Sequence, residues 1–165
     1  MNIPLPRFTF LMGPSKSFLE ELQKSEPCAQ VIDFMDPISR TCKDLGVEGL
    51  EIEVEAMIRT QKPDFLGQLH LRDYRLFASE LQMIYHGVRT RADVYPFATE
   101  YGLRSCVVLR LGELLPHGLE RTDVHPILTI WLPPMEATLQ LRHLEGELTR
   151  QLAPIEQKEL SDDDG

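Results

Sequence analysis

The chain has few cysteines, no long apolar run and no excess of basic residues, and each absence argues against a class of protein. Cys28, Cys42 and Cys106 form no C-x-x-C pair, so we expect reduced, mostly buried thiols in a cytoplasmic protein. No stretch approaches 18 apolar residues and no secretory leader is evident, so we expect no membrane span. The net charge of −9 repels nucleic acid and disfavours duplex binding.

The short motifs of several enzyme classes are also missing. The sequence contains no G-x-S-x-G, H-E-x-x-H or G-x-G-x-x-G, and its five histidines are scattered without an H-x-x-x-H pair. A zinc site is therefore disfavoured. The 165 residues, 42% hydrophobic and 26% charged, fit one globular domain with its own core. We expect residues 1–155 to form that domain and 156–165, which include three consecutive aspartates, to form a disordered acidic tail.

Strand-like and helix-like segments alternate along the chain. The segment 50–60 alternates apolar and acidic residues, which favours a strand, but its glutamate and alanine content favours the helix that we expect. The expected strands are 8–12, 31–35, 81–86, 105–111 and 137–141, and the expected helices are 17–25, 36–45, 50–60, 63–80, 91–101 and 144–152. This order predicts an α/β three-layer sandwich with a five-stranded, mainly parallel sheet. Ligands of such sheets bind beyond the carboxyl ends of the strands.

The first candidate site follows the first expected strand and reads Gly13-Pro14-Ser15-Lys16-Ser17. Lys16 would neutralise a phosphate, Ser17 would bind phosphate or metal, and the following helix would add its dipole. A full phosphate-binding P-loop reads G-x-x-x-x-G-K-[ST], whereas only Pro14 and Ser15 separate Gly13 from Lys16. The alternative is an ordinary strand-to-helix turn with a solvated lysine.

Two further candidates follow the second and third expected strands. Asp36, before Pro37, could receive a substrate hydroxyl or act as a base, or it could simply cap a helix. Arg89 and Arg91 lie where clamps for phosphate or carboxylate groups belong. The alternative is a pair of surface arginines, but an arginine at a helix N-terminus opposes the helix dipole, which favours the functional interpretation.

Taken together, these segments resemble the small phage deoxynucleoside monophosphate kinases of the P-loop kinase fold. The resemblance is carried by 13–17, by Phe-Met-Asp-Pro-Ile at 34–38, by the strand and Val-Arg-Thr-Arg-Ala-Asp at 84–93, by the glycine and apolar strand at 102–111, and by Asp-Val-His-Pro at 123–126. It implies a nucleotide kinase with ATP and Mg²⁺ as donor, Ser17 toward the metal and Lys16, Asp36 and Arg89 as catalytic residues. The nucleotide-binding residues that it implies are Gly13, Ser15, Lys16, Ser17, Arg40, Arg91 and His125.

The chain also departs from this family. The loop lacks its central glycines, Gly87 stands where the family has a metal-ordering acid, and Asp93 stands where it has glutamate. A basic lid is not obvious, because Arg59, Lys62, Arg72 and Arg75 lie among many acids. Phosphoryl transfer depends on positioning and charge neutralisation, and one lost donor of this kind costs roughly 10²–10³ in rate.

Two functions follow as expectations. The first is phosphoryl transfer from ATP to a (deoxy)nucleoside monophosphate or modified nucleotide. The second is a catalytically inactive descendant of the fold that binds a nucleotide or a protein. The apolar segment 127–134 around Trp131 would suit a partner interface, although an ordinary strand or core segment is the favoured alternative there.

Overall fold

The computed structural model describes residues 3–112 and 127–163, with the backbone alone for 152–163. Its centre is an all-parallel sheet of five strands in the order β2-β3-β1-β4-β5. The strands are β1 (Phe8–Met12), β2 (Gln30–Asp33), β3 (Met83–His86), β4 (Cys106–Leu111) and β5 (Thr129–Leu132). The predicted α/β sandwich with a five-stranded parallel sheet is thereby confirmed.

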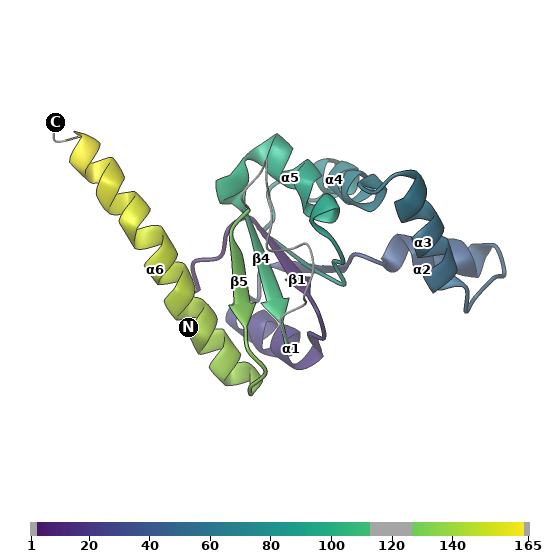
Figure 1. Ribbon diagram of the computed structural model, residues 1–165, viewed down its shortest axis with the longest axis horizontal. Helices are drawn as coiled ribbons and strands as arrows, with labels where there is room; N and C mark the ends of the chain where they lie inside the picture. The colour runs from purple at the N-terminus through teal and green to yellow at the C-terminus, as the bar shows by residue number, and fades with distance from the viewer. Residues whose placement is uncertain (1–2, 113–126, 164–165) are drawn as a thin grey trace.

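Helices cover both faces of the sheet. One face packs against α1 (Lys16–Ser25) and α6 (Ala137–Asp163). The other face packs against α2 (Asp36–Asp44), α4 (Phe65–Phe77) and α5 (Arg91–Tyr101). The helix α3 (Glu51–Gln61) lies beside α2, and the pair projects from one side of the molecule while α6 runs along the opposite side (Figure 1).

The strand β1 shows why the sheet needs two helical layers. All five of its residues are buried, and they alternate between the two hydrophobic clusters, with Phe8, Phe10 and Met12 in one and Leu11 in the other. A strand buried on both faces reads as a continuous apolar run, as this one does. Phe8 packs edge-on against Tyr74 of α4, with ring centroids 4.8 Å apart, and such aromatic pairs add to the stability gained from burial alone.

Several helix starts differ from the predictions. The helix α1 begins at Lys16, one residue before the predicted start at Ser17, and its N-cap is Ser15 without a side-chain cap bond. Met35 is the N-cap of α2, so the predicted capping role of Asp36 is wrong. The Asp33 carboxylate stabilises the turn before α2 instead, because its Oδ1 accepts a hydrogen bond from the Met35 amide at 2.9 Å.

The predicted fifth strand at 137–141 is wrong, because Ala137 begins α6 and the fifth strand is Thr129–Leu132. Ile130 and Leu132 are buried and Trp131 is 39% exposed, so the segment proposed as a partner interface contains an ordinary edge strand. The helix α6 continues to Asp163, into the segment expected as a tail. Cys42 and Cys106 are buried and Cys28 is exposed. None of the helices in 3–112 and 127–163 has the length and apolar composition needed to cross a membrane.

Candidate functional site

The loops after β1 and β3 lie side by side, because the two strands are neighbours in the sheet. The Val88 amide in the second loop donates a hydrogen bond to the Leu11 carbonyl at 3.3 Å. The helix that follows β1 lies on one face of the sheet and the helix that follows β3 lies on the other. Such a divergence marks the switch point where parallel sheets bind their ligands.

The loop after β1 is short and pressed against β4. Only Gly13, Pro14 and Ser15 connect β1 to α1. Gly13 has φ +101°, and a Cβ on it would lie 2.4 Å from the Leu111 carbonyl oxygen, so only glycine fits there. Lys16 begins α1 and is exposed.

The loop after β3 is held by a buried carboxylate. Asp93, on the first turn of α5, is 0% exposed. Its Oδ2 accepts hydrogen bonds from the amides of Arg89 at 3.0 Å and Thr90 at 3.2 Å, and Thr90 and Asp93 form the capping box of the helix. Because one side chain binds both amides, the backbone that carries Arg89 has a fixed conformation.

The helix α3 supplies the counter-charge for Asp93. Arg59 donates from Nη1 to Asp93 Oδ1 at 2.7 Å and from Nη2 to Oδ2 at 3.1 Å, the paired geometry of a strong guanidinium–carboxylate contact. Arg59 Nε also donates to Glu55 Oε2 at 2.8 Å. Burial alone would lower the pKa of Arg59, but the hydrogen bonds that it donates to Asp93 and Glu55 outweigh this effect and raise the pKa. Arg59 is therefore a half-buried structural cation rather than a residue of a basic lid.

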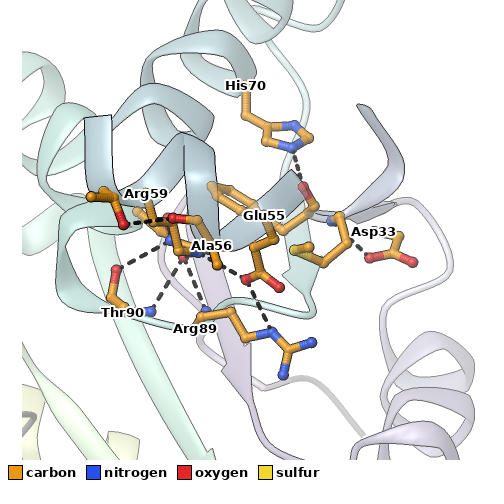
Figure 2. A network of polar contacts seen from close by, with 11 residues as sticks. Asp33, Glu55, Ala56, Arg59, His70, Arg89 and Thr90 are labelled. Carbon is orange, nitrogen blue, oxygen red and sulfur yellow. Dashed lines mark hydrogen bonds and ion pairs between the residues drawn. The ribbon is translucent and has the colours of Figure 1, made fainter. Parts of the chain in front are cut away.

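Arg89 carries its charge toward solvent. Its side chain is 59% exposed, and its Nε lies 3.5 Å from Glu55 Oε2. In Figure 2, Arg59 and Arg89 approach Glu55 from different sides. Arg91, the first residue of α5, is half-buried, with Nε and Nη1 shielded from solvent. The accessible cations of this edge of the sheet thus include Lys16 after β1 and Arg89 after β3.

Asp36 and Arg40, predicted as part of the same site, lie elsewhere. Both are on α2, where the Arg40 Nε lies 3.4 Å from Asp36 Oδ2 in an exposed pair. They line a cleft over β2 and β3, together with residues of α4. His125 lies outside the described residues. The structure therefore brings together the residues that follow β1 and β3 and places those of α2 along a different surface.

The sequence interpretation missed Glu55 and treated Arg59 only as a member of a possible lid. The one local signal is their spacing of four residues, which places them on one side of a helix. Asp93 is 34 residues from Arg59, and nothing local in the sequence pairs them. The pairing depends on how α3 packs beside the start of α5.

The fit of these residues to ATP and Mg²⁺ can be judged from the β1–α1 loop. A P-loop surrounds a triphosphate with several backbone amides, whereas here three residues connect strand to helix and Leu111 occupies the space beside Gly13. The described residues contain no group of three or more side chains able to ligate a metal. The connection is therefore too short to wrap a triphosphate in that way. No family model matches this chain, and no curated protein matches it.

Proposed function

We propose that this protein is a nucleotide-kinase-like module that binds the phosphate of a nucleoside monophosphate and does not transfer phosphoryl groups efficiently. The observation that carries the proposal is the arrangement of Lys16 and Arg89 on adjacent loops at the carboxyl ends of β1 and β3. A parallel sheet with this divergence of helices binds its ligands at that place.

The charges suit a monophosphate. Lys16 begins α1, whose first-turn amides and helix dipole attract an anion. Arg89 adds a guanidinium that can form paired hydrogen bonds to phosphate oxygens. Two accessible cations and a helix N-terminus balance the charge of one phosphate group, while the rest of a chain with net charge −9 repels larger polyanions.

The geometry disfavours transfer from ATP. Efficient transfer needs a loop that positions and neutralises the β- and γ-phosphates. The close contact between Gly13 and Leu111 leaves no glycine-lined cradle of that kind. Gly87 also offers no carboxylate after β3, where the resembling kinases have an acid. Catalysis of phosphoryl transfer is therefore the alternative that the experiment must test.

The experiment is calorimetric titration of a panel of nucleoside and deoxynucleoside monophosphates, and of ATP with Mg²⁺, into the wild type and two variants. Lys16→Ala and Arg89→Ala should each weaken monophosphate binding by about 10–100-fold, because a hydrogen bond to a charged group contributes about 1.5–3 kcal/mol. Lys24→Ala is the matched control, since Lys24 lies at the far end of the same helix and forms an exposed ion pair with Glu21 at 3.2 Å. Its affinity should equal that of the wild type.

Three results would contradict the proposal. One is the absence of binding by every monophosphate, and another is binding that neither variant weakens. The third is micromolar binding of ATP with Mg²⁺ that disappears in Lys16→Ala, accompanied by formation of nucleoside diphosphate, which would establish the kinase activity instead. Trp131, the single tryptophan of the chain, gives a second readout, because its Nε1 donates to the Gly112 carbonyl at the end of β4.

A further inference from the structure

A separate cleft lies over strands β2 and β3, on the face of the sheet that α2 and α4 cover. Its volume is about 270 Å³. Its floor is formed by buried side chains, His70, Tyr74 and Tyr85, and its mouth by exposed or half-buried ones that include Asp36, Arg40, Asp73 and Phe77. This combination of an aromatic floor with a few polar groups is typical of sites for small molecules.

The hydroxyl of Tyr85 distinguishes this cleft from an accidental surface depression. Tyr85 is 1% exposed, and no residue of the described chain forms a hydrogen bond with its hydroxyl, whereas the neighbouring Tyr74 hydroxyl donates to the Ser79 carbonyl at 2.8 Å. The Tyr85 hydroxyl is also not among the solvent-shielded side-chain atoms that lack a partner, so it is reached from the cleft that Tyr85 lines. A ligand in the cleft can therefore form a hydrogen bond with it in place of water.

The protonation states around the floor are set by burial. Burial, and then the neighbouring Tyr74 and Asp73, raise the pKa of Tyr85, so the phenol stays protonated. Burial lowers the pKa of His70, against the effect of its hydrogen bond to the Phe34 carbonyl at 2.8 Å, so the imidazole is neutral at pH 7. The floor thus carries no positive charge of its own.

The charged lining of the mouth consists of Asp36, Asp73 and Arg40, so two carboxylates face one guanidinium and the balance favours a cation. Arg40 lies 3.4 Å from Asp36, and the Asp73 carboxylate lies 3.3 Å from Arg72, an exposed arginine outside the lining. Such surface pairs are weak, and a ligand cation can replace them at little cost. The faces of aromatic rings also attract cations, and Phe77 at the mouth offers an exposed apolar wall.

We propose that this cleft binds a small organic cation, an alkyl- or arylammonium. Its ammonium group donates to the Asp73 carboxylate and to the Tyr85 oxygen, and its apolar part lies against Phe77 and Ile32. This inference is independent of the proposed phosphate site, because no residue of the cleft belongs to the loops after β1 and β3.

The test is titration of 2-phenylethylammonium into the full chain, with binding measured by calorimetry or by NMR chemical-shift changes. Two ligands of similar shape but different charge serve as controls. We expect the ammonium to bind with a Kd below about 1 mM, the neutral 2-phenylethanol to bind at least tenfold more weakly, and the anionic 3-phenylpropionate not to bind. Equal affinity for the alcohol and the ammonium, or no binding of the ammonium, would overturn the inference.

Variants locate the site. Asp73→Asn removes a charge from a partly exposed side chain and should weaken ammonium binding at least tenfold, and Tyr85→Phe, which keeps the ring, should weaken it several-fold. Asp44→Asn is the charge-matched control on an exposed residue of α2 outside the cleft, and it should bind like the wild type. If Tyr85→Phe does not fold, Asp73→Asn decides alone, and unchanged affinity in that variant overturns the inference. Lys16→Ala should leave ammonium binding unchanged, so failure here and failure of the phosphate proposal are separate results.

Discussion

Replacing Asp93 by asparagine tests the central interaction of the candidate site. The substitution keeps the shape of the side chain but removes the charge that Arg59 binds at 2.7 and 3.1 Å. Asparagine has one carbonyl oxygen, so it cannot accept hydrogen bonds from Arg59 while fully retaining those from the amides of Arg89 and Thr90. The guanidinium of Arg59, 16% exposed, would remain buried without its main counter-ion.

The expected loss of stability is about 3 kcal/mol. Removing one partner of a buried ion pair costs about 3–5 kcal/mol, because the other charge is left uncompensated. Glu55 still accepts a hydrogen bond from Arg59 at 2.8 Å, so the guanidinium keeps one carboxylate and the loss falls at the lower end. For a chain of this length, a loss of about 3 kcal/mol lowers Tm by about 6–12 °C.

Urea unfolding measures this loss, with helix content followed by circular dichroism and Trp131 followed by fluorescence. The control is Asp44→Asn, which removes an exposed carboxylate and should change the free energy of unfolding by less than about 0.5 kcal/mol. In the double variant Asp93→Asn/Arg59→Met, the total loss should be smaller than the sum of the two single losses, because the second change removes the unpaired charge. A loss below about 1 kcal/mol for Asp93→Asn, or strict additivity in the double variant, would refute the reasoning.

Three other predictions concern glycine, threonine and histidine. Gly13→Ala should lower the free energy of unfolding by at least about 2 kcal/mol in urea titrations, since φ is +101° and the new Cβ would lie 2.4 Å from the Leu111 oxygen. Gly46→Ala, at φ +71° with no atom nearby, should lose only about 1 kcal/mol, and equal losses would contradict the role of Leu111. Thr9→Val should be neutral or stabilising by up to about 2 kcal/mol in the same assay, because the buried Thr9 hydroxyl has no hydrogen-bond partner among the described residues, and a clear loss would mean that it has one. Burial lowers the pKa of His70 in the folded chain, so the unfolded state takes up a proton first as the pH falls below about 6.5. Stability should therefore decrease from pH 7 to pH 5 more steeply in the wild type than in His70→Gln, and parallel pH profiles would contradict this assignment.

The sequence alone predicts the bounds of a helix or strand where one kind of local pattern dominates. The strand β4 and the helix α5 were predicted within one residue at each end, because β4 opens with four consecutive apolar residues, Cys106 to Leu109, and α5 is bounded by Thr90 and Gly102. The fifth strand was missed because two patterns compete in residues 137–141. Their alternation of apolar and polar residues resembles a strand, but Leu141, Leu144 and Leu148 form a buried stripe at helical spacing.

The candidate site could be predicted only in part for a related reason. Strand ends meet at one edge of a parallel sheet, so the loops that contain Lys16 and Arg89 could be expected there. Which loops become neighbours depends on the strand order, and β1 lies next to β3 while β2 lies at the edge. For that reason Asp36 and Arg40, which follow β2, line a different cleft, although their sequence positions are equivalent to those of the other candidates.

The ion-pair network also bears on the proposed role of Arg89, because it would let Arg89 bind a ligand without disturbing the fold. Glu55 contacts both Arg59, at 2.8 Å, and Arg89, at 3.5 Å. If the Arg89 side chain binds a phosphate instead of Glu55, Glu55 still contacts Arg59, the closer and more buried of its two cations. No buried charge is then left unpaired. The backbone of Arg89 stays fixed as well, because its amide is bound by Asp93 rather than by Glu55. Asp93 thus fixes the backbone of Arg89, and Glu55 is the exchangeable partner of its side chain. If one carboxylate bound both the amide and the guanidinium of Arg89, it would lose one of these contacts each time the ligand bound.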